Sequence, residues 1–222
     1  MRYPVNEIFF SMQGEGAFTG TPAAFVRMQG CPVGCPWCDT KHTWERKDMK
    51  RVAVSTILLK TEVPTEEWTW FTPEDIARTL SNWRCHHVVI TGGEPCAHDL
   101  EPLTVLLERA GYRAQIETSG TFEIKASRGA YVTVSPKIDM PGGRKVLQSA
   151  LERADEIKYP VGRDRDVERL TSLILPHTKV PSDRVFLQPL SMSTKATELC
   201  INSARAKGWR VSVQTHKVAG VR

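Results

Sequence analysis

Short apolar runs alternate with longer amphipathic segments along the chain, most regularly after residue 72. The short runs predict strands at 23–28, 87–91, 113–118, 131–134, 156–159, 184–188 and 210–214. The longer segments carry apolar residues at helical spacing and predict helices at 72–80, 100–111, 146–154, 164–175 and 194–207. Strands that alternate with helices pair in parallel through right-handed crossovers. The pattern therefore predicts an α/β protein whose mainly parallel strands form a partial (β/α) barrel.

Capping signals support two of these helices. Thr72 is a good N-cap, and it is followed by a proline at the first helical position and by two acidic residues in the first turn. Near the end of the chain, Gly208 is expected to stop the 194–207 helix, because glycine adopts the left-handed conformation that ends many helices.

Residues 44–71 interrupt the alternation of strands and helices. The segment is polar, charged and rich in tryptophan, with one predicted helix at 55–60. We interpret it as an insertion on one domain that spans residues 1–222, rather than as a second domain. Contact with a reductase and contact with a second subunit are both open roles for this insertion.

Polar or glycine-rich clusters directly follow five of the predicted strands. They lie at 91–94, 117–119, 135–137, 188–189 and 214–216. Parallel α/β folds build their sites at the carboxyl ends of the strands, so these clusters are expected to converge on one face. The ordinary polarity of loops explains any single cluster equally well, but five together favour a shared site.

Composition and charge exclude several classes of protein. Of 222 residues, 41% are hydrophobic and 25% are charged, which is typical of a globular chain and not of a disordered or fibrous one. The net charge of +5 is modest and its basic residues are dispersed, so direct contact with nucleic acid is not expected. No apolar run reaches the roughly 18 residues of a membrane span, and residues 1–7 lack the apolar core of a signal peptide. We expect a cytoplasmic protein without membrane contact.

Three of the six cysteines fall within one short segment, with the spacing C-x3-C-x2-C at Cys31, Cys35 and Cys38. Three thiolates in one loop can hold three irons of a cubane [4Fe–4S] cluster and leave the fourth iron open for a reacting ligand. The alternative is a structural zinc site in which His42 supplies the fourth ligand. Trp37, beside the last cysteine, fits either a stacking surface for an adenine or a core position. The other three cysteines are interpreted as small buried side chains.

The cysteine segment, followed by Gly92-Gly93-Glu94-Pro95 at the end of the next predicted strand, resembles the radical S-adenosylmethionine (SAM) enzymes. The resemblance implies a radical SAM fold, a [4Fe–4S] cluster on the three cysteines, and SAM chelating the open iron through its methionine amino and carboxylate groups. It also implies that Gly93 faces SAM, that the Gly-Gly-Glu-Pro segment contacts its amino group, and that Ser135, Lys137 and Gln188 hold its ribose and carboxylate. The full set of implied SAM-binding residues is Trp37, Asp39, Gly93, Glu94, Ser135, Pro136, Lys137 and Gln188.

Further motifs are similar to those of the 7-carboxy-7-deazaguanine synthase family. They lie at 13–16, 27–31, 37–40, 117–120, 135–137 and 214–217 and cover almost the whole chain. The resemblance implies a lyase that contracts the ring of 6-carboxy-5,6,7,8-tetrahydropterin to 7-carboxy-7-deazaguanine and releases ammonia, a step toward queuosine. It also implies assistance by Mg²⁺, regeneration of SAM, a flavodoxin-like electron donor and a homodimer.

The same resemblance implies how the substrate is bound. Arg27 would pair with the substrate carboxylate, and Thr91 would face the substrate. The pterin-contacting turn would comprise Met12, Gln13 and Gly14, and Thr40 would contact Mg²⁺ through its hydroxyl.

Simpler interpretations stand beside several of these roles. Arg27 could be an exposed arginine at a strand end, residues 12–14 a plain glycine turn, and Asp39-Thr40 a helix cap. Glu117 could contact either ligand. His216 and Lys217 either close the site or belong to an exposed tail.

The sequence leaves two other functions open. A radical SAM enzyme could act on a protein glycine or a tRNA base instead of a pterin. A zinc-stabilised nucleic-acid-binding module would use the cysteines and the positive charge, but it would leave Gly92-Gly93-Glu94 without a role.

Overall fold

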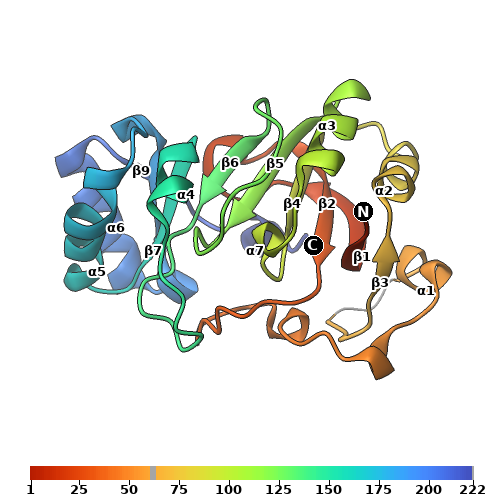
Figure 1. The fold of residues 1–222 in the computed structure, drawn as a ribbon. Helices are drawn as coiled ribbons and strands as arrows, with labels where there is room; N and C mark the ends of the chain where they lie inside the picture. Colours follow the sequence, from red (N-terminus) through yellow and green to blue (C-terminus); the bar gives the residue numbers. More distant parts are fainter. Residues whose placement is uncertain (61–63, 222) are drawn as a thin grey trace.

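The computed structural model describes residues 1–60 and 64–221, and within these ranges nine strands form one sheet (Figure 1). The strand order is β3-β1-β2-β4-β5-β6-β7-β8-β9. Neighbouring strands from β2 to β9 run parallel, whereas β1 is antiparallel to both β2 and β3. The predicted α/β fold with a mainly parallel sheet is confirmed, and the sheet stays open, as in a partial barrel. The strands are β1 Tyr3–Met12, β2 Pro22–Met28, β3 Thr69–Phe71, β4 His87–Gly92, β5 Arg113–Thr118, β6 Tyr131–Val134, β7 Glu156–Val161, β8 Val185–Pro189 and β9 Arg210–Val211.

Helices pack against the strands that they connect. α3 contacts β5, α4 contacts β6, α5 contacts β7, and α6 contacts both β8 and β9. The helices are α1 Val54–Leu58, α2 Pro73–Leu80, α3 Glu101–Arg109, α4 Gln148–Arg153, α5 Asp164–Arg169, α6 Thr194–Lys207 and α7 Thr215–Ala219. Among these helices of the described ranges, none combines the length and the apolar composition that crossing a bilayer needs.

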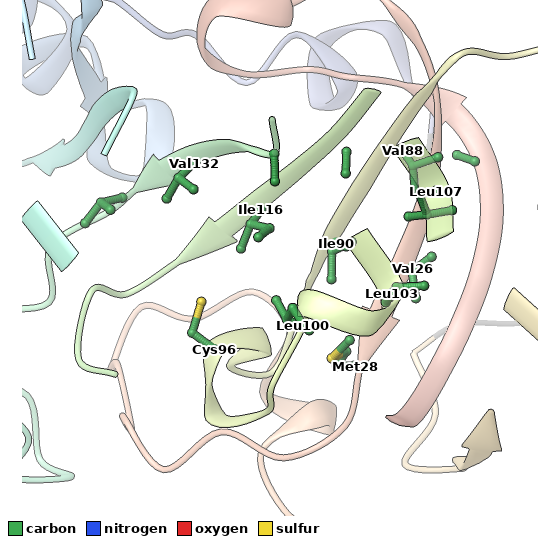
Figure 2. Close-up of a cluster of buried hydrophobic side chains, with 14 of the residues drawn as sticks. Val26, Met28, Val88, Ile90, Cys96, Leu100, Leu103, Leu107, Ile116 and Val132 are labelled. Carbon is green, nitrogen blue, oxygen red and sulfur yellow. The ribbon is translucent and has the colours of Figure 1, made fainter. Parts of the chain in front are cut away.

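Alternation along the central strands separates an apolar face from a polar one. In β5, Ala114 and Ile116 belong to the core under the helices, whereas Gln115 and Glu117 occupy the opposite face. Figure 2 shows the core side, where side chains of β2, β4, β5 and β6 meet the apolar face of α3. The residues labelled there are fully or almost fully buried: Val26, Met28, Val88, Ile90, Cys96, Leu100, Leu103, Leu107, Ile116 and Val132. The polar face is consequently free to build a site.

Most predicted elements are present, some with the predicted bounds. β5, β6 and α6 begin and end where the pattern places them, and Gly208 follows α6 with a φ of 68°. α2 starts after a Thr72 capping box, in which Thr72 and Asp75 bond each other's backbone N–H. These elements have strong local signals, which explains why the sequence predicts them well.

Three elements are not predicted by the pattern, and others are predicted too long, most clearly the helix at 164–175 and the strand at 210–214. Of the helix, α5 covers Asp164–Arg169, and a π-helix covers Leu170–Ile174. β1 is missed because its first seven residues are all buried, which removes the polar alternation of a strand, and because it contains Pro4. β3 has only three residues, and α7 has five. β9 covers Arg210–Val211 instead of 210–214, because Gln214 leaves the sheet to contact Glu15.

The segment 44–71 joins the same sheet at its edge. α1 contacts β1 and β3, and β3 pairs with the beginning of β1 (Figure 1). Trp68 is fully buried, and its Nε1 donates to the backbone oxygen of Lys47 at 2.9 Å. The predicted helix at 55–60 is present as α1, Val54–Leu58. Residues 61–63 of the predicted insertion lie outside the described residues.

Candidate functional site

One cleft with a volume of about 360 Å³ opens at the carboxyl ends of the parallel strands. It contains every sequence-predicted site residue except Pro136, which is buried beside it between Ser135 and Lys137. The predicted residues brought together are Met12, Gln13, Gly14, Arg27, Cys31, Cys35, Trp37, Cys38, Asp39, Thr40, Thr91, Gly93, Glu94, Ser135, Lys137 and Gln188. Glu117, His216 and Lys217 line it as well. The predicted convergence of the strand-end clusters is therefore observed, whereas the ligand roles stay predictions.

Backbone hydrogen bonds close the cysteine loop into a compact turn. Gly30 N donates to Thr43 O at 2.7 Å, and Cys31 N donates to Trp44 O at 2.9 Å, so the two ends of the loop are joined. Within the loop, Cys38 N donates to Cys35 O at 3.0 Å. All six cysteines of the chain, each within the described ranges, are free thiols. Burial raises the pKa of the Cys31 thiol to about 11, so a thiolate there requires a metal to displace the proton.

A glycine strap formed by Gly92 and Gly93 packs directly against the beginning of this loop. Gly93 N donates to Met28 O at 2.8 Å, and Glu94 N donates to Gly30 O at 2.9 Å. A Cβ on Gly93 would lie 2.2 Å from Gly30 O, which is a clash with backbone. Gly92 has a φ of 106°, a conformation that favours glycine. The two glycines thus let the strap and the cysteine loop approach each other.

The carboxylate of Glu94 is held inside the protein by donors on both of its oxygens. Oε1 accepts from Cys96 N at 3.0 Å and from the Thr118 hydroxyl at 2.6 Å. Oε2 accepts from Ser119 N at 2.9 Å and from the Ser119 hydroxyl. Glu94 is 2% exposed, and these bonds join the end of β4 to the end of β5. Glu94 therefore fixes the strap to the end of β5.

The donor set fits an iron–sulfur cluster better than a single metal ion. Three soft thiols from one loop line the cleft, as ligands of an iron–sulfur cluster would. His42, the fourth ligand in the mononuclear zinc alternative, is not among the residues that line it. Trp44 lines the same cleft, and its Nε1 is buried without a hydrogen-bond partner among the described residues.

A second part of the cleft lining, referred to below as the opposite wall, carries polar side chains from β8 and from the loop after β6. Lys137 Nζ donates to Ser135 Oγ at 2.5 Å, and Gln188 Nε2 donates to Glu15 Oε1 at 3.2 Å. Burial lowers the pKa of Lys137. This wall offers an ammonium, a hydroxyl and an amide, which suit the hydroxyl and carboxylate groups of a ligand.

Arg27 lies at the end of β2 and lines the cleft, so it is not an exposed strand-end residue. Its Nε donates to Glu7 Oε1 at 2.5 Å, and its guanidinium lies 5.6 Å from the centroid of the Phe9 ring. Burial lowers the pKa of Arg27, and the neighbouring carboxylates of Asp39 and Glu117 oppose this shift. The hydrogen bond from Nε to Glu7 orients the guanidinium toward an anionic group in the cleft.

The turn after β1 is covered by the C-terminal helix. Thr215 N donates to Gly14 O at 3.0 Å, and a Cβ on Gly14 would lie 2.1 Å from His216 Nδ1. Lys217 Nζ donates to Asp39 Oδ2 at 3.1 Å, which links α7 to the cysteine loop. His216 and Lys217 therefore close the cleft rather than extend from it as a tail.

A buried lysine, Lys158 of β7, lies on the polar face of the sheet below this turn. Its ammonium pairs with Glu15 Oε2 and, at 3.2 Å, with Glu117 Oε2. The side chains of Lys158, Glu15 and Glu117 are 6%, 14% and 21% exposed. Burial raises the pKa of Glu15, but the Lys158 charge and hydrogen bond outweigh it and hold the pKa at about 2. Burial likewise lowers the pKa of Lys158, but the two carboxylates raise it overall.

The sequence motifs did not single out Glu15 or Lys158 as site residues. Glu15 lies within the 13–16 motif, but the motif gives it no role. The sequence predicts Lys158 only as part of the strand at 156–159. Its signal was the alternation Glu-Ile-Lys-Tyr at 156–159, because a parallel strand covered on both faces is normally apolar throughout.

Comparisons with known proteins agree with this geometry. A profile of the radical SAM superfamily matches residues 25–141. The 7-carboxy-7-deazaguanine synthase of Escherichia coli (strain K12) is 52% identical over 223 residues, covering 100% of both chains, and that of Buchnera aphidicola subsp. Schizaphis graminum is 42% identical with the same coverage. The crystal structure of QueE from Escherichia coli superimposes with a TM-score of 0.90 at 51% identity, covering 96% of this chain and 94% of that one. The chain therefore belongs to the radical SAM superfamily and, within it, to the 7-carboxy-7-deazaguanine synthase family.

Proposed function

We propose that the protein converts 6-carboxy-5,6,7,8-tetrahydropterin to 7-carboxy-7-deazaguanine with release of ammonia, the ring-forming step toward 7-deazapurines such as queuosine. The observation that carries this proposal is the cleft itself, which gathers the three cysteines, the glycine strap and Arg27 in one place. The names of the full-length relatives support the same reaction. The protein is then a carbon–nitrogen lyase.

Membership of the superfamily implies a [4Fe–4S] cluster and SAM. Bound together, these groups supply one-electron chemistry that abstracts a hydrogen atom from the substrate. Cys31, Cys35 and Cys38 would hold three irons of the cluster. Because the strap packs on the cysteine loop, Gly93 and Glu94 would fix the position of SAM relative to the cluster.

The other proposed SAM-binding residues lie on the exposed rim and the opposite wall of the cleft. Trp37 is 42% exposed at the rim, where its ring offers a stacking surface for adenine, and Asp39 lies two residues further along the loop. On the opposite wall, Ser135, Lys137 and Gln188 offer hydrogen bonds to the ribose and carboxylate. Pro136 would keep Ser135 and Lys137 directed into the cleft.

Arg27 would bind the carboxylate of the substrate. A guanidinium already oriented through its Nε by Glu7 loses little rotamer freedom when it pairs with a carboxylate, which favours binding. Met12, Gln13 and Gly14 would contact the pyrimidine part of the pterin, and Thr91 would face the ring. α7 covers this turn and would limit access of water to the reacting carbon.

We assign the Mg²⁺ contact to Thr40. Its hydroxyl lines the cleft 3.5 Å from Cys38 Sγ, next to the proposed cluster. Mg²⁺ takes oxygen ligands and keeps several waters, so one hydroxyl together with substrate oxygens makes a suitable set. Thr40→Ala should reduce the stimulation of turnover by added Mg²⁺, whereas Thr40→Ser should preserve it.

We also propose that a flavodoxin-like protein delivers the electron. The cysteine loop reaches the surface, and the exposed Lys41 follows it directly. Lys41→Glu should slow turnover with reduced flavodoxin at low salt but leave turnover with dithionite unchanged. Lys195→Glu, an equal charge change on exposed α6, is the matched control. Equal rates for all three proteins with flavodoxin would exclude docking beside the loop.

We further propose that the protein is a homodimer, as the family resemblance implies. Light scattering of the anaerobically purified protein during size-exclusion chromatography measures this directly. Elution at the mass of a single chain, 24.9 kDa, across micromolar concentrations would contradict the proposal.

The reaction itself is tested by anaerobic incubation of the reconstituted protein with SAM, reductant, Mg²⁺ and the carboxypterin. The expected product is 7-carboxy-7-deazaguanine, identified by its mass and its deazapurine absorbance, together with ammonia. Cleavage of SAM without conversion of the carboxypterin would instead favour another radical SAM substrate, such as a protein glycine or a tRNA base.

A further inference from the structure

We propose that Lys158 is a positioning residue, which keeps the carboxylates of Glu15 and Glu117 together, ionised and fixed as hydrogen-bond acceptors on the floor of the cleft. The inference rests on the proposed function for the identity of the substrate. Lys158, Glu15 and Glu117 all line the cleft, but the Lys158 side chain is only 6% exposed and its ammonium is already paired with both carboxylates. It would therefore act through Glu15 and Glu117.

The geometry shows that both carboxylates depend on one cation. Glu15 comes from the turn after β1 and Glu117 from β5, so no local backbone link holds them together. The ammonium of Lys158 pairs with one oxygen of each. Two carboxylates that share a buried site without a cation repel each other, and one of them takes up a proton. Lys158 removes that penalty and connects β7 both to the turn after β1 and to β5.

Glutamine amides occupy the remaining oxygens and fix the orientation of each carboxylate. Gln13 Nε2 donates to Glu117 Oε1 at 3.0 Å. Gln214 Nε2 donates to Glu15 Oε1 at 2.7 Å, and Gln188 Nε2 donates to the same atom at 3.2 Å. Ionised carboxylates can only accept hydrogen bonds. The floor of the cleft thus suits a ligand with several N–H groups, and a reduced pterin is such a ligand.

Other charged groups around Lys158 belong to the same electrostatic balance. Glu156, two residues earlier on β7, has a pKa that burial raises and that Lys158 lowers, with the net shift upward. Lys137, in the loop after β6, has a lowered pKa, first because of burial and then, among other causes, because of Lys158. His216 of α7 contributes positive potential at Glu15, and Arg27 and His87 interact with the charge of Glu117. The charged or titratable groups that face the Lys158 ammonium or its partners are Glu15, Glu117, Glu156, Lys137, Arg27, His87 and His216.

The test compares Lys158→Met with Lys158→Arg in the reconstituted holoenzyme. Lys158→Met should lower kcat/KM for the carboxypterin roughly 100-fold at neutral pH, mainly through KM. The acid limb of its kcat/KM profile should move to higher pH, because protonation of either carboxylate removes an acceptor. Lys158→Arg keeps the positive charge and should restore at least part of the loss.

A double variant separates positioning from simple stabilisation. Lys158→Met leaves the carboxylates of Glu15 and Glu117 unpaired, and Lys158→Met/Glu117→Gln removes one of them, so the double variant should recover part of the lost melting temperature. Its KM for the carboxypterin is compared with that of Glu117→Gln alone, which lacks the same acceptor. If Lys158 only stabilises the fold, the two KM values should agree, and that result would overturn the proposal. If Lys158 also positions Glu15, the double variant should have the higher KM. Lys60→Met is the matched control, because Lys60 is a part-buried lysine that donates to Asn6 O at 3.0 Å, outside the cleft. It should leave the pH profile unchanged.

A titration that needs no turnover keeps this inference separate from the proposed reaction. The protein carries ¹³C-labelled glutamate carboxyls and an oxidised cluster, and the Glu15 carboxyl signal is assigned by its loss in Glu15→Gln. In the wild type, this signal should titrate at a pKa of about 2. In Lys158→Met it should move to or above the ordinary value of 4.5. An unchanged titration would overturn the inference even if the carboxypterin is the substrate. A shifted titration without any carboxypterin turnover by the wild type would support the Lys158 contact and reject the proposed reaction.

Discussion

The contact between the glycine strap and the cysteine loop predicts the effect of one added methyl group. In Gly93→Ala, the new Cβ would lie 2.2 Å from Gly30 O and 2.7 Å from Gly30 C, both of which are backbone atoms. The strap must therefore retreat by about 0.8 Å before the Cβ–oxygen distance reaches even 3.0 Å, the lower limit of real contacts. This movement stretches the hydrogen bonds from Gly93 N and Glu94 N, now 2.8 and 2.9 Å long, beyond bonding range.

The cost follows from these two effects. Overpacking costs about 1–3 kcal/mol, and each lost hydrogen bond costs about 0.5–1.5 kcal/mol. A total loss of about 3 kcal/mol corresponds to a fall in Tm of about 6–12 °C for a chain of this size. Because the strap supports the cysteine loop, we also expect less iron per chain and slower cleavage of SAM after anaerobic reconstitution.

Gly111→Ala is the matched control for this experiment. Gly111 has a φ of 84° and open space around the position of a Cβ, so alanine there meets backbone strain without a clash. The expected loss is about 1–2 kcal/mol, with iron content and SAM cleavage unchanged. The measurements are melting by circular dichroism, iron per chain and SAM cleavage for the three proteins. A Gly93→Ala protein with wild-type Tm, iron and cleavage would refute the steric reasoning.

Three further predictions concern single side chains in the cleft. Arg27→Ala should raise KM for the carboxypterin about 30- to 150-fold, because a charged hydrogen-bonded pair contributes about 2–3 kcal/mol. The Kd for SAM should stay unchanged. An unchanged KM would show that Arg27 does not bind the substrate. Cys35→Ala should yield colourless protein without SAM cleavage, checked by absorbance and iron assay, and a brown, active variant would contradict its role as a ligand. The lowered pKa of Glu15 contributes stability that is complete above about pH 4.5 and is lost as pH falls toward 2. Glu15→Gln should therefore flatten the decline of the urea midpoint below about pH 5. If the urea midpoints of the wild type and Glu15→Gln decline with pH at equal slopes, the ion pair with Lys158 is contradicted.

Local signals explain which parts of the fold the sequence predicts. Caps and turn residues mark the ends of α2 and α6, and periodicity marks the central strands. β1 carries no such signal, since its identity as a strand comes from burial on both faces and from pairing with β2 and β3. α7 likewise depends on its contacts with Gly14, because five residues are too few to be stable as an isolated helix.

The sequence likewise predicts one part of the site and misses another. The cysteine spacing and the strand-end clusters identify the rim of the cleft, because those residue types have a recognisable chemistry. On its floor, the sequence identifies Glu117 but not Glu15 and Lys158, since these two residues are 143 positions apart and come together only when the sheet forms. The role of the strap glycines also became clear only from the structure. Their lack of a side chain admits the neighbouring backbone at Gly30, whereas the sequence alone suggested approach to a ligand.

The central claim is that the Cys31–Cys35–Cys38 loop binds a four-iron cluster with one iron available to SAM. Mössbauer spectroscopy of ⁵⁷Fe-reconstituted, oxygen-protected protein, recorded with and without SAM, tests it most directly. The account predicts the spectrum of a cubane in which about one quarter of the iron signal changes when SAM is added. Absence of a cubane, or a cubane spectrum that SAM leaves unaltered, would contradict the account.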